Sequence, residues 1–218
     1  MSLVAISQRL LENETYPETR ECLDVRWGDF CRAIGALPLV LPHAIDPEVY
    51  LDRFAPEGVI LTGGNDLASA SPGPLSERRD AFERRLLAGA IARKIPVLAV
   101  CRGSQLVAET FGAGLARVAG HAGVRHRIRF ERGTRMGAAF ADLPEVNSYH
   151  GWAPTKVPDG FALVAAAEDG TVEAFEDRAR GVYAHLWHPE REAALTPAEL
   201  DFYRALFERE SVTREGTR

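Results

Sequence analysis

The chain has 218 residues, of which 46% are hydrophobic and 26% charged, enough for one domain with a buried core. Its 26 basic and 31 acidic residues give a net charge of −5, which argues against a protein that coats nucleic acid or an anionic membrane surface. The sequence shows no long apolar run and no pattern of a secretory leader, and its three cysteines are too few for a disulfide framework. We therefore expect a cytoplasmic protein.

The first half of the chain alternates short apolar runs with helical patterns. Four strands are predicted, at residues 3–7, 37–41, 58–61 and 96–100. Three helices are predicted between them, at residues 20–35, 47–54 and 76–93. Strands that alternate with helices form a parallel sheet covered on both faces. We therefore expect an α/β, doubly wound core.

The pattern changes after residue 115. Residues 125–130 alternate like a half-exposed strand, and the runs at 161–167 and 171–175 predict an antiparallel extension of the sheet. A last core strand is predicted at residues 182–186. We expect a single domain over residues 1–210.

A final helix is marked by local capping residues. Thr196 suits the N-cap, Pro197 the first helical position, and Glu199 follows the cap by three residues. The apolar positions continue to Phe207, and the polar residues 211–218 are expected to form a disordered tail.

The most informative residue is Cys101, which ends the strand at 96–100 immediately before a helical pattern. Such a turn holds a side chain at the carboxyl edge of the sheet, and the helix N-terminus favours a thiolate. Gly103 suits the close approach that a tight turn needs. A buried core cysteine is the alternative, and that is our interpretation of Cys22 and Cys31. For Cys101 the context favours a nucleophile.

A thiolate nucleophile needs a base and a group that orients the base. His188 follows the last core strand, so it lies at the same sheet edge as Cys101, and Glu190 can turn back toward its imidazole. Taken alone, this segment could equally be a loop histidine beside a solvated carboxylate. His43 and His185 have no such partner and are interpreted as structural. No spacing of histidines and cysteines indicates zinc, and we expect no metal and no cofactor.

Gly63 and Gly64 come directly after the buried strand at 58–61. Their backbone N–H groups, with the N–H of Arg102, can form an oxyanion hole. Alone, this pair of glycines is an ordinary turn; beside Cys101 we expect the oxyanion function.

Together the LTGGND loop, the VCRGSQ turn, residues 147–150 and the WHPE segment resemble the class I glutamine amidotransferase superfamily. The resemblance covers residues 6–207 and is to the free-standing γ-glutamyl hydrolases of the peptidase C26 type. It implies a flavodoxin-like fold, with Cys101 as the nucleophile that forms a γ-glutamyl thioester, His188 as base and Glu190 as its orienting group. Gly63 and Gly64 match the family's oxyanion loop.

The resemblance also implies substrate-binding positions, which are Gln105, Asn147, Ser148, Tyr149 and His150. The chain departs from the family pattern in two places. Ala99 stands where the family usually has glycine, and residues 151–152 are Gly-Trp where many members carry a polar residue. The second departure bears on substrate identity.

Residues 8–9, 22–27, 79–83 and 187–191 look like those of the γ-glutamyl-CDP-amidate hydrolases, which act in making the phosphoramidate decoration of bacterial capsules. These enzymes cleave a γ-glutamyl phosphoramidate of a nucleotide, releasing glutamate or a glutamine-derived product. Arginine suits phosphate contacts, and six arginines lie along one stretch: Arg117, Arg125, Arg127, Arg129, Arg132 and Arg135. We favour a solvated strand face for this cluster and expect Arg102 to be the better candidate for touching substrate.

The leading hypothesis is a self-contained cysteine hydrolase acting on a small γ-glutamyl substrate, which the closer resemblance makes nucleotide-linked. A glutaminase subunit that delivers ammonia to a separate synthetase and a γ-glutamyl-aminobutyrate hydrolase are alternatives. A catalytically silent interaction domain is disfavoured, because Cys101, His188 and Glu190 are all present. The oligomeric state stays open.

Overall fold

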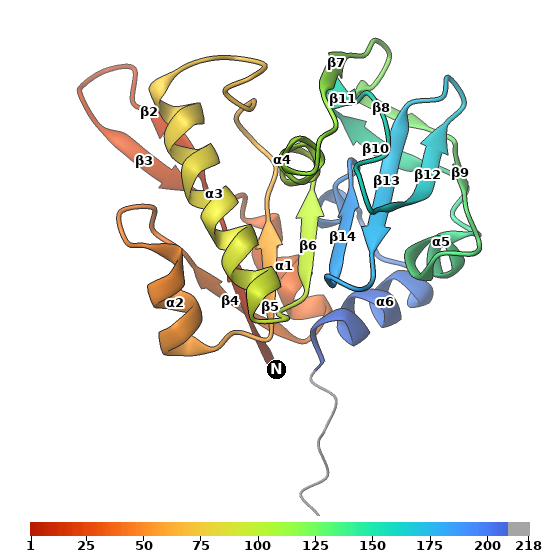
Figure 1. Cartoon of the computed structure of the whole chain (residues 1–218), viewed down its shortest axis with the longest axis horizontal. Helices are drawn as coiled ribbons and strands as arrows, with labels where there is room; N and C mark the ends of the chain where they lie inside the picture. The colour runs from red at the N-terminus through yellow and green to blue at the C-terminus, as the bar shows by residue number, and fades with distance from the viewer. Residues whose placement is uncertain (209–218) are drawn as a thin grey trace, which may run out of the picture.

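The computed structural model describes residues 1–208, so the expected tail at 211–218 lies outside the described residues. An eight-stranded sheet forms its centre (Figure 1). Five of its strands pair in parallel and the remaining three are antiparallel. In sheet order the strands are β4 (Ala36–Val40), β1 (Ser2–Ile6), β5 (Gly58–Leu61), β6 (Val97–Val100), β14 (Val182–His185), β13 (Val172–Asp177), β12 (Ala162–Ala167) and β9 (Ile128–Phe130). The predicted parallel core with an antiparallel extension is confirmed.

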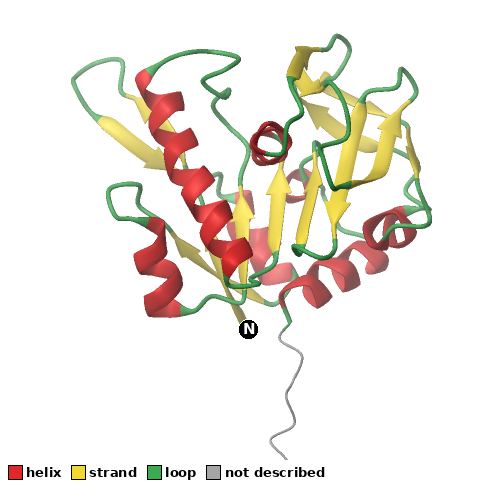
Figure 2. Cartoon of the chain, in the orientation of Figure 1, coloured by secondary structure: helices red, strands yellow, loops and turns green. Residues whose placement is uncertain are grey.

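Helices cover both faces of this sheet (Figure 2). One face carries α1 (Arg26–Ala33), α5 (Arg135–Phe140) and α6 (Pro197–Phe207). The other carries α2 (Pro47–Phe54), α3 (Pro74–Ala92) and α4 (Arg102–Thr110). Every residue of β5, β6 and β14 is buried, because strands between two helical layers have no solvent-facing side. The doubly wound α/β class is therefore confirmed.

Three two-stranded sheets lie beyond the carboxyl ends of the parallel strands, at the top of Figure 1. They pair β2 (Arg9–Glu12) with β3 (Thr19–Cys22), β8 (Ala122–His126) with β10 (Val146–Tyr149), and β7 (Leu115–Arg117) with β11 (Trp152–Pro154). A short 3₁₀ helix, η1 (Pro189–Arg191), follows the last core strand. These additions surround the edge where Cys101 was expected.

The helix predicted at residues 20–35 is wrong in its first part. Residues 19–22 form β3, whose partner is β2, and α1 begins only at Arg26. The turn between them is held by Asp24, whose side chain accepts a hydrogen bond from the Arg26 N–H at 3.0 Å. Cys22 is consequently half-buried at a strand end, whereas Cys31 lies in the core of α1. Burial raises the pKa of the Cys31 thiol to about 11, as fits a structural cysteine.

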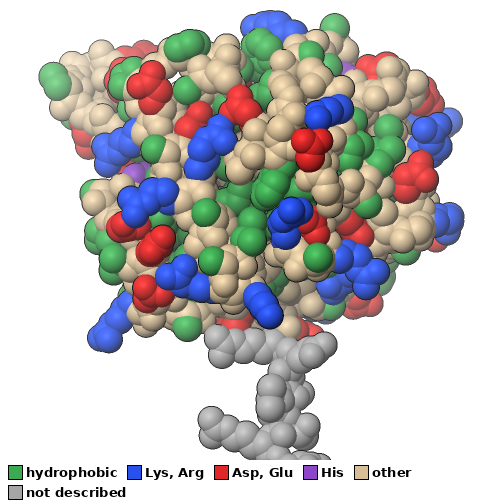
Figure 3. Space-filling view, in the orientation of Figure 1, with side chains coloured by type: hydrophobic (Ala, Val, Ile, Leu, Met, Phe, Trp, Pro, Cys, Tyr) green, Lys and Arg blue, Asp and Glu red, His purple; other side chains and the backbone are tan. Residues whose placement is uncertain are grey.

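The single strand predicted at residues 125–130 is also wrong. The chain changes sheets at Arg127, because β8 pairs with β10 whereas β9 pairs with β12. The arginines of this stretch therefore do not share one face: Arg125 pairs with Glu145 and Glu192, while Arg129 is exposed beside Glu131. Figure 3 shows basic and acidic side chains interspersed over the face that carries α3.

The last helix matches its prediction. Thr196 caps α6 and accepts a hydrogen bond from the Glu199 N–H, while the Glu199 carboxylate accepts one from the Thr196 N–H. Within residues 1–208, no helix combines the length and apolar character that a membrane crossing requires.

Candidate active site

Cys101 occupies a strained turn between β6 and α4. Its φ of 52° and ψ of −105° lie in a region that non-glycine residues rarely adopt. Its N–H donates to the His185 carbonyl at 2.9 Å, and its carbonyl accepts from the Gln105 N–H at 3.0 Å. A Cβ on Gly103 would lie 2.4 Å from the Leu61 carbonyl oxygen, so only glycine lets α4 start this close to β5. The sharp strand-to-helix turn expected at Cys101 is present.

His188 lies against Cys101 and is held by Glu190. The His188 Nδ1 and the Glu190 Oε1 are 2.6 Å apart, and both side chains are buried. Burial by itself would lower the pKa of His188. The charge interactions and hydrogen bonds of His188 with Cys101 and Glu190 outweigh burial and raise this pKa to about 9. His188 is therefore an imidazolium at neutral pH, hydrogen-bonded to Cys101.

The loop after β5 brings Gly63 between these two side chains. A Cβ at Gly63 would be 2.8 Å from the His188 Cε1 and 3.5 Å from the Cys101 Cβ. Gly64 has a φ of 124°, which a side chain would strain. The Arg102 N–H belongs to the first turn of α4, where backbone donors have no partner within the helix. The Gly63 backbone and the N–H of Arg102 therefore both lie next to Cys101.

A buried ion network supports this loop, and sequence reasoning missed its role. Arg79 donates from Nη2 to the carbonyls of Thr62 at 2.8 Å and Gly63 at 2.9 Å. Its Nε donates to Glu83, which also binds Arg102. The i,i+4 spacing of Arg79 and Glu83 on one helix was the available sequence sign.

The Arg102 side chain does not face a substrate. It is 1% exposed and ion-paired with both Asp80 and Glu83. The expectation that this side chain touches substrate is therefore wrong, because two buried carboxylates hold the guanidinium inside the protein. The expectation for the backbone N–H of Arg102, which follows Cys101 directly at the start of α4, is separate from the side chain and stays a prediction.

The segment at residues 147–150 braces the His188 loop. Asn147 accepts from the His188 N–H at 2.9 Å and donates to the His188 carbonyl at 2.8 Å. Ser148 is buried and donates to the His121 carbonyl. Tyr149 is 46% exposed and packs edge-on against the His188 ring, with centroids 5.7 Å apart. Asn147 and Ser148 are thus engaged by protein groups, and Tyr149 is the exposed member of the segment.

Two further expected substrate-binding residues are turned to other partners. His150 is buried and lies 3.4 Å from the Glu173 carboxylate, away from His188. Gln105 is 4% exposed and donates to the Trp152 carbonyl at 2.8 Å. The structure therefore brings together Cys101, His188, Glu190 and the glycine loop, and does not bring His150 to them.

A small hollow opens beside His188 and Gly63. Cys22, Asp24 and Trp27 line one part of it, and Arg9 and Arg191 supply its basic groups. The Arg191 guanidinium lies 4.5 Å from the centroid of the Tyr149 ring. The sequence indicated Arg9 and Arg191 only through a resemblance. Their shared position could not be predicted, because it is the fold that brings β2 and η1 to the same hollow.

This arrangement has the parts needed to transfer an acyl group from an amide nitrogen to sulfur and then to water. It offers a thiol next to an oriented imidazole, backbone donors for a developing oxyanion, and basic groups at the entrance.

Comparison with known proteins agrees with this chemistry. The family model of peptidase C26 matches residues 2–190. Gamma-glutamyl-CDP-amidate hydrolase from Campylobacter jejuni is 33% identical over 200 residues, covering 90% of this chain and 94% of that enzyme. GMP synthase from Marinobacter nauticus is 32% identical over 148 residues, which are 64% of this chain and 26% of that enzyme. A glutamine amidotransferase from Thermotoga maritima shares the fold, with a TM-score of 0.63, 17% identity, and coverage of 87% of this chain and 76% of its own.

Proposed function

The chain belongs to the peptidase C26 family, a hydrolase family acting on C–N bonds, and from this we propose that it hydrolyses a γ-glutamyl amide whose leaving group carries a nucleotide diphosphate. The observation that carries the proposal is the contact of Cys101 with His188, whose other ring nitrogen is held by Glu190 at 2.6 Å. The hydrolase named for a γ-glutamyl nucleotide amidate supports the substrate class.

In the first step, the Cys101 sulfur attacks the γ-carbonyl carbon and the C–N bond breaks. The carbonyl oxygen becomes an oxyanion that the N–H groups of Gly64 and Arg102 stabilise. His188 donates its proton to the departing nitrogen, so this nitrogen leaves as the NH₂ group of the nucleotide phosphoramidate and the γ-glutamyl group remains as a thioester.

In the second step, water cleaves the thioester. His188, now neutral, takes a proton from water, and the resulting hydroxide adds to the thioester carbon. Collapse of the oxyanion releases glutamate and the Cys101 thiolate, while His188 keeps the proton. Glu190 orients the imidazole throughout and stabilises its charged form.

Arg9 and Arg191 are the proposed contacts to the phosphates. Both line the hollow beside His188, whereas Arg127 immediately precedes the edge strand β9 and Arg129 lies within it. Guanidinium groups bind phosphate oxygens in a bidentate manner, so each contact adds affinity for a diphosphate and none for a small amine. Binding energy from these remote groups aligns the scissile amide with Cys101.

The test compares kcat/KM of the purified chain for a γ-glutamyl nucleotide diphosphoramidate, for free glutamine and for γ-glutamyl-aminobutyrate. We expect a clear preference for the nucleotide substrate, weakened by added salt because exposed charge pairs are screened. Arg191→Met should raise KM for the nucleotide substrate about 10-fold or more and leave the short amides unchanged. Arg129→Met is the matched control, since Arg129 is exposed and remote from the hollow.

Each alternative has its own outcome. Equal efficiency on γ-glutamyl-aminobutyrate and the nucleotide substrate, without a salt effect, would leave only a general γ-glutamyl hydrolase. Weak activity on every amide until a synthetase partner is added would favour an ammonia-delivering glutaminase subunit. Retained turnover in Cys101→Ala would refute the cysteine mechanism itself.

A further inference from the structure

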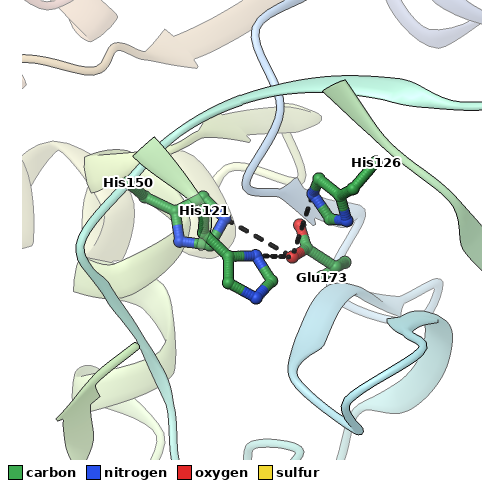
Figure 4. A group of neighbouring side chains, drawn as sticks. All are labelled: His121, His126, His150 and Glu173. Carbon is green, nitrogen blue, oxygen red and sulfur yellow. Dashed lines mark ion pairs between the residues drawn. The ribbon is translucent and has the colours of Figure 1, made fainter. Parts of the chain in front are cut away.

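Away from Cys101, three histidines and one glutamate meet at a place that the proposed reaction does not use (Figure 4). His121 precedes β8, His126 ends β8, His150 follows β10, and Glu173 lies in β13. We propose that these four side chains bind one zinc ion. Spacing along the chain could not indicate the site, because its ligands come from separate segments that only the fold brings together.

The distances match those of a metal centre. One carboxylate oxygen, Oε1 of Glu173, is 3.1 Å from the His121 Nδ1, 3.6 Å from the His126 Nε2 and 3.4 Å from the His150 Nε2. All four candidate ligand atoms lie within 4.8 Å of one another. Tetrahedral zinc with bonds of about 2.0–2.1 Å separates neighbouring ligand atoms by about 3.3 Å. The cluster therefore needs only small adjustments to enclose an ion.

The polar atoms of this cluster are buried without hydrogen bonds. Among the described residues, none pairs in hydrogen-bond geometry with the His121 Nδ1, the His126 Nε2, either ring nitrogen of His150 or either oxygen of Glu173. Glu173 is 0% exposed and His150 is 2% exposed. A buried carboxylate without a donor is costly, and proteins tolerate one when it is paired or coordinates a metal. An ion between these atoms would satisfy them together.

A second carboxylate orients one of the proposed ligands. The His121 Nε2 lies 2.9 Å from an Asp169 oxygen, which leaves Nδ1 to face Glu173. Asp169 is itself held by the Thr171 N–H at 2.9 Å. A carboxylate on the outer nitrogen of a histidine sets its tautomer and strengthens it as a metal ligand.

The donor set selects zinc over other common cations. Three imidazole nitrogens with one carboxylate oxygen suit zinc, whereas magnesium and calcium prefer oxygen ligands throughout. Four protein ligands fill a tetrahedral shell, so the ion would be structural, with no position left for substrate. A surface hollow of about 180 Å³, lined by His121, His126 and Asp169, provides a route for the ion to enter.

The site is placed to stabilise the loop that carries His188. The Glu173 carbonyl accepts from the Leu186 N–H at 2.8 Å, close before His188 in the chain. The strand that leads to His150 carries Asn147, which hydrogen-bonds both backbone groups of His188. A bound ion would join β8, β10 and β13 and hold this loop from two sides.

The first experiment measures zinc content and affinity. The purified chain is stripped with a chelator, titrated with zinc chloride against a chromophoric competitor, and assayed for bound metal by mass spectrometry. We expect one tightly bound zinc per chain, both in the wild type and in Cys101→Ala, which rules out binding at the catalytic thiol. Glu173→Gln keeps the shape of the side chain and removes its charge, so its zinc affinity should fall at least 10-fold.

His43→Gln is the matched control, because His43 is also a buried histidine next to a glutamate but lies outside the cluster. It should keep one zinc and, like the wild type, gain thermal stability when zinc is added, whereas Glu173→Gln should gain none. Should Glu173→Gln fail to fold, the visible absorption of tetrahedral cobalt bound to the wild-type chain decides instead. Absence of stoichiometric zinc together with absence of that cobalt spectrum would overturn the proposal. Neither readout depends on turnover or on the substrate.

Discussion

Replacing Gly63 by alanine should disable the site while leaving the fold intact. The added Cβ would lie 2.8 Å from the His188 Cε1, whereas carbon atoms pack at about 3.5–4.0 Å, so the ring must move by about 0.7 Å or more. His188 cannot yield cheaply, because Glu190 holds its ring and Asn147 holds its backbone. A displacement near 1 Å in a reacting geometry costs about 100-fold in rate, or about 2.7 kcal/mol of transition-state stabilisation.

The assay is kcat/KM on a γ-glutamyl amide, with thermal unfolding measured in parallel. Gly28→Ala is the matched control, since a Cβ there meets no atom within 4 Å and alanine within α1 stabilises a helix by about 0.5–1 kcal/mol. It should keep full activity. If Gly63→Ala retains wild-type kcat/KM, the close approach of this loop to His188 is not a constraint on the reaction.

Three further predictions test the catalytic unit and its support. Cys101→Ala should abolish turnover, His188→Ala should be nearly as damaging, and Glu190→Gln should be milder, all measured as kcat/KM against unchanged circular dichroism. The pKa of His188 is raised to about 9, so the imidazolium persists below that pH and kcat/KM should fall as the pH rises through about 9. In Cys101→Ala the pKa of His188, measured by NMR titration, should drop. An unchanged pKa would mean that Cys101 is not what raises it. Glu83→Gln leaves two buried arginines short of a countercharge and should lower the free energy of unfolding, measured with denaturant, by about 3–5 kcal/mol. The control Glu131→Gln changes an exposed residue and should lower it by less than about 0.5 kcal/mol. Equal effects would contradict the supporting role of the network.

Local patterns were sufficient for the parallel core of this fold and for placing Cys101 and His188 at one edge of its sheet. Apolar runs bounded by turn residues predicted β5, β6 and β14, because strands buried on both faces tolerate few polar residues. Thr196 and Glu199 predicted the start of α6, because a capping box is contained within four consecutive residues. Cys101 and His188 were identifiable because each follows a core strand, and the carboxyl ends of parallel strands meet at one edge.

Contacts between distant segments could not be obtained in this way. Residues 20–22 carry a helical pattern, yet they pair with β2, because strand pairing depends on which segment lies alongside. The Arg102 side chain follows the nucleophile, yet two carboxylates of α3 draw it into the interior.

His150 belongs by sequence to a segment expected to bind substrate, yet it faces Glu173, 23 positions further along the chain. A residue's backbone conformation depends largely on its neighbours in sequence. The sequence by itself therefore determined most of the helices and core strands. The direction and partner of a polar side chain depend on the charges that packing brings within a few ångströms, and these only the tertiary structure decided.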